Sequence, residues 1–326
     1  RLFQPSKEYF PEGSFRHYMP GVGSRFRDIG EDSESGRPGG KGMGLGGDSR
    51  IVYAILMVLD SLHRRVRNKL PLLRDNEIKA LCRNGASTYG VVAAKTGGPP
   101  SANHPQDTAI LAKLGVRGGL LDPAIRRTYL RRLVSRVRGA MEGAGKPQIL
   151  EIFLDVFGFS RGATEARVFL HWMGELFEGE TLCGVPVRFR FVGLFDTVAS
   201  VLVPDSAGGS GHMGWAQTEH LRIPGRVHAC VHYVAMHEPR ASFPADWVML
   251  GGARPSNCHE YLLPGAHSDV GGGYLPSEQG KGILGRDDEK LSQIALNLMY
   301  NAARSAGVTA LNRASAKDGP YDPFAI

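Results

Sequence analysis

The chain lacks the features that would place it in a membrane-spanning or metal-binding class of protein. Its longest unbroken apolar run, Ile51 to Leu59, is far shorter than the roughly 20 residues that cross a bilayer as a helix. Its four cysteines lie far apart and form no C-x-x-C pair, which disfavours a zinc or thiol-redox site. No signal-peptide pattern opens the chain, so Sec-type export is not expected. These absences predict a soluble protein that can touch a membrane but does not span it.

Glycine and positive charge are both in excess. The 326 residues include 43 glycines, nearly twice the usual share of about 7%, which predicts many tight turns. The net charge is +7 and the pI about 9.3, so we expect anionic partners, and charge alone leaves nucleic acid and anionic membrane both open. The length suits one large α/β domain with excursions, or two smaller domains.

Loop-rich segments alternate with two strong helical patterns in the first half of the chain. Asp48 is expected to cap a helix that keeps helical spacing of apolar residues up to Val66, and Asp122 with Pro123 to begin another. The second helix bears arginines on its outer face, where a solvated surface is favoured over a lipid- or phosphate-binding one. These arginines are Arg126, Arg127, Arg131, Arg132, Arg136 and Arg138. The expected loop-rich segments are residues 1–47 and 95–107, and an irregular tail is expected at 308–326.

The second half alternates strands with helices. Apolar runs predict strands at residues 149–157 and 187–195, and helical spacing predicts helices at 162–176 and 290–304. Strand, helix and strand in succession are typical of a parallel sheet covered on both sides. The sequence therefore predicts an α/β fold with a mostly parallel central sheet and helices on both faces.

The segment GFSRG lies where the first of these strands gives way to a helix. In that setting G-x-S-x-G is typical of a nucleophile elbow, a tight turn that exposes Ser160. We expect side chains at Gly158 and Gly162 to collide with neighbouring backbone. The N–H of Arg161 begins the helix and can donate to an oxyanion. A purely structural Gly-Ser corner is the alternative.

A serine nucleophile needs a histidine and a carboxylate to activate it. In α/β-hydrolases the order along the chain is serine, then the acid, then the histidine. Asp196 ends the next predicted strand, at the edge where such sheets place function, and Asp205 is its rival. His267 lies in the glycine-rich loop GAHSDVGGGY, which leaves its ring free to reach the serine. His259 and His237 are weaker candidates because each lies beside a glutamate in apparently regular structure.

Three other patterns resemble cofactor sites only in part. The run GGKGMGLGG has the wrong glycine spacing for a phosphate loop, and Gly42 stands where Ser or Thr would hold magnesium. His228 and His232 lie four residues apart without an obvious third ligand, so ordinary packing is favoured over a metal site. HEYLL departs from a zincin because Leu263 replaces the second histidine. We therefore expect neither a metal nor an organic cofactor.

Several motifs occur together in a familiar order. FGFSRGATEAR, VGLFDTVASV, AMHEPRASFP, LLPGAHSDVGGGY and LSQIALNLM, preceded by YMPGVGSRFRDIGE, resemble landmarks of the α/β-hydrolase domain of the first family of type VI secretion lipase effectors. The resemblance covers most of residues 18–299. It implies a phospholipase of the A1 or A2 type, with Ser160 as nucleophile, Asp196 as acid and His267 as base.

The resemblance also implies where the protein acts and with what. The expected partners are membrane phospholipid as substrate, a secretion spike protein and an immunity protein, without nucleic acid. The protein would be cytoplasmic in the producer, would be secreted by the type VI system into the periplasm of a rival bacterium, and would act at a membrane surface.

One family feature has no counterpart in this sequence. Family members begin with a strand and an FDGT-like loop that supplies the second oxyanion N–H, whereas this chain opens with RLFQPS. We expect that strand to precede Arg1 and residues 1–326 to form a single catalytic domain. Two alternatives stay open: an esterase acting on soluble or polysaccharide esters, and an inactive hydrolase fold that serves as a binding module.

Overall fold

The protein is seen in a computed structural model, which describes twelve stretches of the chain. They are residues 13–32, 44, 46–85, 105–120, 122–144, 149–201, 212, 214–241, 243–249, 253–274, 277–278 and 289–308. Asp205, residues 95–104, most of the tail at 308–326 and much of the segment 1–47 lie outside them.

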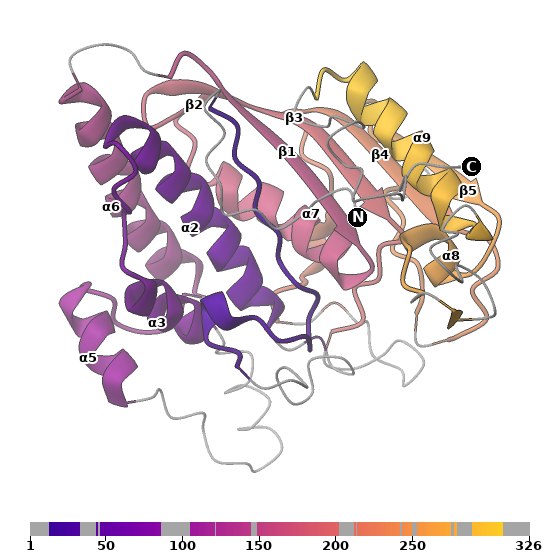
Figure 1. The fold of residues 1–326 in the computed structure, drawn as a ribbon, viewed down its shortest axis with the longest axis horizontal. Helices are drawn as coiled ribbons and strands as arrows, with labels where there is room; N and C mark the ends of the chain where they lie inside the picture. Colours follow the sequence, from indigo (N-terminus) through magenta and orange to yellow (C-terminus); the bar gives the residue numbers. More distant parts are fainter. Residues whose placement is uncertain are drawn as a thin grey trace.

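A parallel sheet forms the centre of the molecule (Figure 1). Its strands are β1 (Ile152–Phe159), β3 (Val185–Phe195), β4 (Val227–Ala235) and β5 (Cys258–Leu263), in the spatial order β1-β3-β4-β5 with every neighbouring pair parallel. The short β2 (Thr181–Leu182) adds an antiparallel pairing to β3. All four main strands therefore end at the same edge of the sheet.

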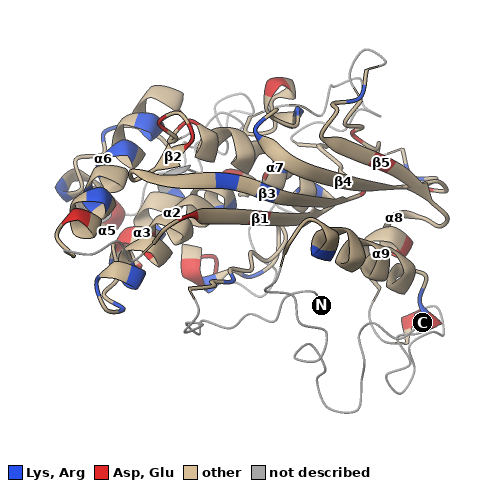
Figure 2. Ribbon diagram, turned by 90° about the horizontal axis from the view of Figure 1, so that it is seen from above, with Lys and Arg blue, Asp and Glu red and all other residues tan. Residues whose placement is uncertain are grey.

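Helices cover both faces of this sheet (Figure 2). On one face α7 (Arg161–Gly174) packs on β1 and β3, and on the other α8 (His267–Gly271) and α9 (Ser292–Ser305) pack on β3 and β4. Each face has its own cluster of buried apolar side chains. The predicted α/β fold with a mostly parallel, doubly covered sheet is confirmed.

A group of helices lies beyond the β1 edge of the sheet. It comprises α2 (Gly47–Val66), α3 (Asp75–Gly85), α5 (Pro105–Lys113) and α6 (Pro123–Glu142), and α2 connects it to the sheet layer by packing on α7. Two short 3-10 turns, η1 (Arg27–Ile29) and η3 (Thr218–Leu221), pack on α3 and α7 respectively. Within the described parts, no helix has both the length and the apolar character needed to cross a bilayer.

Of the two predicted helix caps, the one at Asp122 is confirmed and the one at Asp48 is wrong. Asp122 caps α6 as expected, since its carboxylate accepts hydrogen bonds from the amides of Ala124 and Ile125. Asp48 does not cap α2: the cap is Gly46, in a left-handed conformation at φ 93°, and Asp48 is buried in the first turn. The expected loop at 95–107 ends early, because α5 begins at Pro105.

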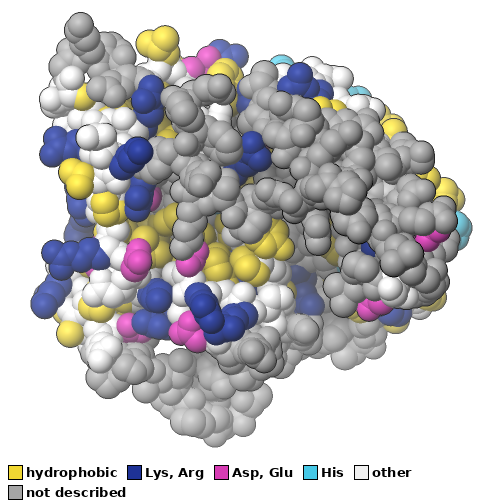
Figure 3. Space-filling model, viewed as in Figure 1, with side chains coloured by type: hydrophobic (Ala, Val, Ile, Leu, Met, Phe, Trp, Pro, Cys, Tyr) yellow, Lys and Arg dark blue, Asp and Glu magenta, His cyan; other side chains and the backbone are white. Residues whose placement is uncertain are grey.

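The arginine-bearing face of α6 is solvated at four positions, whereas Arg138 is half-buried and pairs with Glu178, and Arg126 is buried. Arg127, Arg131, Arg132 and Arg136 are exposed, and Figure 3 shows basic side chains spread over this side of the molecule. Arg126 is instead buried: its guanidinium lies 3.8 Å from the centre of the Trp172 ring and donates to Glu175. Arg126 therefore anchors α6 to α7, because a delocalised cation stacks well on an indole.

Candidate active site

Ser160 joins β1 to α7 in a strained backbone conformation. Its φ is 57° and its ψ −129°, in a region that non-glycine residues seldom occupy. The turn is fixed by the end of the neighbouring strand, because the Ser160 amide donates to the Phe195 carbonyl at 2.9 Å and the Val198 amide donates to the Ser160 carbonyl at 3.3 Å. A strained serine at a strand-to-helix corner is the local geometry expected of a nucleophile elbow.

The two glycines of the elbow differ in what they are needed for. A Cβ on Gly158 would lie 2.3 Å from the Gly162 carbonyl oxygen and 2.6 Å from the Ala163 Cα, so only glycine fits there. A Cβ on Gly162 would meet nothing within 4 Å. The prediction was correct for Gly158 and wrong for Gly162, since the first turn of α7 crosses over the end of β1 and the crowding is on the strand side.

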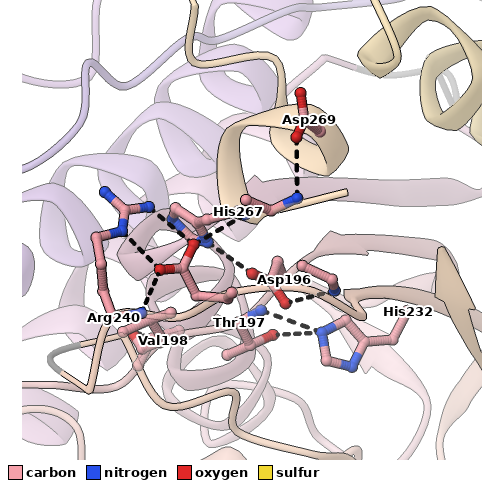
Figure 4. A network of polar contacts seen from close by, with 11 residues as sticks. Asp196, Thr197, Val198, His232, Arg240, His267 and Asp269 are labelled. Atoms are coloured by element: carbon pink, nitrogen blue, oxygen red, sulfur yellow. Dashed lines mark hydrogen bonds and ion pairs between the residues drawn. The ribbon is translucent and has the colours of Figure 1, made fainter. Parts of the chain in front are cut away.

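Asp196 follows directly on β3 and is fully buried. Its amide donates to the Tyr233 carbonyl at 2.7 Å, and its backbone has a φ of 40°. One carboxylate oxygen, Oδ1, accepts from the Ala235 amide at 2.9 Å, and the other, Oδ2, lies 2.6 Å from Nδ1 of His267 (Figure 4). The strand end thus presents the carboxylate to the histidine in a single orientation.

His267 is the first residue of α8 and is also buried. A carboxylate only accepts hydrogen bonds, so the proton of the neutral ring lies on Nδ1 and Nε2 is left as a base. The ring is held between two aromatic neighbours, with centroids 4.6 Å from Phe159 and 5.2 Å from Phe243. Phe159 immediately precedes Ser160, so the histidine packs against the elbow.

His267 therefore lies at the start of a helix and not in the expected loop, and the turn that leads into it is held at both sides. The Asp269 carboxylate accepts from the Ala266 amide at 2.9 Å (Figure 4). Gly265 has a φ of 108°, which favours glycine. Glu238 accepts from the His267 amide at 3.0 Å, a contact that the sequence did not predict. Hydrogen bonds from Arg240 are the main reason that the pKa of Glu238 is lowered to about 2. Glu238 therefore stays ionised and continues to accept the hydrogen bond from the His267 amide.

Ser160 and the hydrogen-bonded pair of Asp196 and His267 lie at the carboxyl edge of the sheet. Ser160 is linked through its amide to Phe195, the neighbour of Asp196, and Phe159 packs on His267. Within the described residues, no hydrogen bond joins the Ser160 hydroxyl to the His267 ring. Catalytic hydrogen bonds are often long in ligand-free structures and tighten when substrate is bound.

The first turn of α7 supplies the electrostatics behind the serine. The helix begins at Arg161, so its N-terminal end, which carries partial positive charge, lies directly behind Ser160. Burial raises the pKa of Glu165, one turn along, to about 8, although Arg50 and Arg161 oppose the shift. A largely protonated Glu165 at neutral pH adds little negative charge to cancel this field.

The rival residues lie in other arrangements. His259 is exposed on β5 and stacks on Tyr261, and His237 accepts a hydrogen bond from the Gly265 amide at 3.1 Å. Neither contacts a carboxylate among the described interactions. A second histidine and carboxylate pair that the sequence did not predict joins Nε2 of His212 to Oδ1 of Asp246 at 2.6 Å.

A cavity of about 310 Å³ opens beside Asp196. It is lined mostly by the segment that follows β4, where apolar side chains such as Met236 and Phe243 face the charged pair of Glu238 and Arg240. A cleft of this kind, beside the carboxylate that bonds to His267, is suited to a substrate with an apolar part and a polar part.

Metal-binding groups are not concentrated here. Among the described residues, no three His, Cys, Asp or Glu side chains are placed to share an ion. His228 and His232, which would need a helix to act together, lie on β4, and His232 is bonded to Thr197 and Glu260 instead.

Part of the chain matches a known family model. Residues 175–302 match the family model described as "T6SS, Phospholipase effector Tle1-like, catalytic domain". The matched segment contains Asp196 and His267, and Ser160 lies before it. No curated protein matches this chain.

Two solved structures are similar. The crystal structure of an uncharacterized protein from Pseudomonas aeruginosa is 33% identical with a TM-score of 0.68, over 90% of this chain and 40% of that one. The structure of the Tle1 effector bound to the VgrG spike from the Type 6 secretion system is 29% identical with a TM-score of 0.30, over 47% of this chain and 31% of that one. The present chain therefore spans less than half the length of either solved chain. The family match confirms the resemblance drawn from the sequence motifs: this chain is similar to the type VI secretion phospholipase effectors, and its residues 175–302 match their Tle1-like catalytic domain.

Proposed function

We propose that the protein is a serine hydrolase that cleaves acyl ester bonds of membrane glycerophospholipids. Ser160 is the nucleophile, His267 the general base and Asp196 the carboxylate that orients it. The observation that carries the proposal is the buried hydrogen bond of 2.6 Å between His267 and Asp196, at the sheet edge where the strained Ser160 lies. The Tle1-like family match supports phospholipid as the substrate class.

The reaction runs in two halves. Nε2 of His267 takes the hydroxyl proton as Oγ of Ser160 attacks the ester carbonyl carbon, and the Arg161 N–H stabilises the resulting oxyanion. The tetrahedral intermediate collapses when His267 gives its proton to the departing lysophospholipid oxygen, leaving an acyl-enzyme. Water, activated by His267, then attacks the acyl carbon and releases the fatty acid and Ser160. Throughout, Asp196 holds the ring proton on Nδ1 and stabilises the transient imidazolium.

The same proposal covers the biological setting. The family match supports export by a type VI secretion system, with a spike protein for delivery and an immunity protein in the producer. The protein then acts as an antibacterial toxin on the membranes of a rival cell, from its periplasmic side. Cleavage at either the first or the second acyl position is compatible with this chemistry.

The test is lipid hydrolysis with the products identified by mass. Purified protein is incubated with mixed-chain phospholipid vesicles, and the released fatty acid reports which ester is cut. Ser160→Ala should abolish both hydrolysis and labelling by a fluorophosphonate, whereas Ser135→Ala, an exposed serine on α6, should change neither. Robust turnover by folded Ser160→Ala protein would refute the assignment. Cleavage of short soluble esters without any lipid hydrolysis would instead favour the esterase alternative.

A further inference from the structure

Three residues of β4 form hydrogen bonds with the segment that carries Asp196. The Tyr233 carbonyl accepts from the Asp196 amide at 2.7 Å, and the Ala235 amide donates to the Asp196 carboxylate at 2.9 Å. The third residue is His232, whose side chain is fully buried and whose Nε2 lies 3.1 Å from the Thr197 amide (Figure 4). His232 therefore contacts the residue next to Asp196.

The hydrogen bonds define the tautomer of His232. A backbone N–H can only donate, so Nε2 must accept from Thr197 and the ring proton lies on Nδ1. That proton is donated to Oε1 of Glu260 at 2.7 Å, and the same oxygen accepts from the Val248 amide at 2.8 Å. Burial lowers the pKa of His232, and the charged groups around it are Glu260, Arg167 and Asp196. The neutral ring is thus fixed at both nitrogens.

Asp196 needs such support because its backbone is strained. A φ of 40° is rarely adopted by residues other than glycine and persists only where the surroundings enforce it. Thr197 is held on both sides, since its amide donates to His232 and its carbonyl accepts from the Asp246 amide at 2.8 Å. If the bond to His232 were lost, the peptide between Asp196 and Thr197 could rotate towards an unstrained conformation and carry the carboxylate away from His267.

We infer that His232, oriented by Glu260, is a positioning residue for the hydrolytic reaction: it fixes the Asp196 carboxylate against His267 through the Thr197 amide. This inference rests on the proposed function, in which the Asp196 and His267 pair is the base. His232 does not touch the reacting atoms, and it acts through Thr197, whose amide and hydroxyl both lie within hydrogen-bonding distance of Nε2, at 3.1 and 3.0 Å.

Two conservative substitutions separate the contacts that Nε2 makes with Thr197 from the hydrogen bond that Nδ1 makes with Glu260. The side chain of His232→Gln can place an acceptor where Nε2 lies and so keep the bond to Thr197. The side chain of His232→Asn reaches only as far as Nδ1, so it can serve Glu260 but not Thr197. Both variants are polar and smaller than histidine, and a general loss of packing would affect both.

The measurement is the steady-state hydrolysis of a soluble short-chain ester across a range of pH. We expect His232→Asn to lower kcat on the order of 10²-fold with KM little changed, as misplacement by about 1 Å does, and His232→Gln to stay within a few-fold of the wild type. The acidic limb of kcat/KM should move to lower pH in His232→Asn, because a poorly aligned carboxylate supports the imidazolium less well. A purely structural role would lower the amount of active protein without moving that limb.

The outcomes are kept distinct by labelling Ser160 with a fluorophosphonate. Absence of labelling in the wild type would overturn the proposed function and this inference with it. If the wild type is labelled, equal activity of the Asn and Gln variants, whether both high or both low, would overturn this inference alone. Should the Asn variant not fold, the Gln variant still decides, because a loss of kcat on the order of 10²-fold in that variant would contradict the inferred role.

Discussion

Replacing Asp196 by asparagine should reverse the proton arrangement of His267, the proposed base. The Ala235 amide can only donate, so it would select the amide oxygen of Asn at the position where Oδ1 now lies. The NH₂ group would then face Nδ1 of His267, where Oδ2 now accepts at 2.6 Å. Because this NH₂ group donates, Nδ1 must become the acceptor and the ring proton must move to Nε2.

The size of the effect follows from this change of tautomer. With a proton on Nε2, His267 cannot accept the hydroxyl proton of Ser160, and the active tautomer must be regained at a cost in free energy. In a serine protease the equivalent loss lowers kcat about 10⁴-fold, which corresponds to about 5 kcal/mol of transition-state stabilisation. Asp196 is buried, so water is not expected to replace the lost carboxylate.

The assay is the turnover of a soluble ester, with thermal unfolding as a check on the fold. Asp196→Asn should keep a cooperative unfolding transition and lose kcat by about 10⁴-fold. The same substitution at Asp205, the rival acid in the sequence, should have little effect. A folded Asp196→Asn protein that retains more than a tenth of wild-type turnover, or a larger loss at Asp205, would show that the tautomer argument is wrong.

The remaining predictions test the elbow, the base and the surface charge. Gly158→Ala should destabilise the protein by about 1–3 kcal/mol or more through overpacking, whereas Gly162→Ala, whose Cβ meets open space, should be neutral or slightly stabilising. Equal melting temperatures of the two variants would count against the described crossing of β1 and α7. His267→Ala should abolish acylation as fully as Ser160→Ala, with the double variant no worse than either, while His259→Ala keeps most activity; additive losses would mean that the two residues do not act as a unit. Binding to anionic vesicles should exceed binding to neutral ones and weaken as salt rises, because the net charge is +7. Equal binding to anionic and neutral vesicles at low salt would show that electrostatic attraction does not drive membrane binding.

The sequence predicted the parts of the site that local pattern determines. Ser160 and Asp196 became candidates because each follows an apolar strand, and strands that run parallel end at one edge of a sheet. His267 was chosen by chain order and by its glycine-rich surroundings, and the structure places it against Asp196. These inferences needed only the order of elements and the residues at their ends.

The contacts that support the site could not be predicted in the same way. Glu238 reaches the His267 amide from 29 residues away, and His232 reaches Thr197 from 35 residues away. Such contacts depend on how β3 pairs with β4 and on the course of the segment that follows β4, and neither can be taken from the order of the elements alone. The burial of Arg126 was missed for a related reason, since Trp172 becomes its neighbour only when α6 packs on α7.

The packing of Phe159 against α8 constrains the order in which this site can change during evolution. A Cβ on Gly271 would lie 1.8 Å from a ring atom of Phe159, so no side chain can be added there while that ring keeps its place. A smaller residue at position 159 would have to come first, and it would remove one of the two aromatic rings that flank His267. Two positions 112 residues apart in the printed sequence are therefore expected to vary together, and in a fixed order, among relatives that keep the same base.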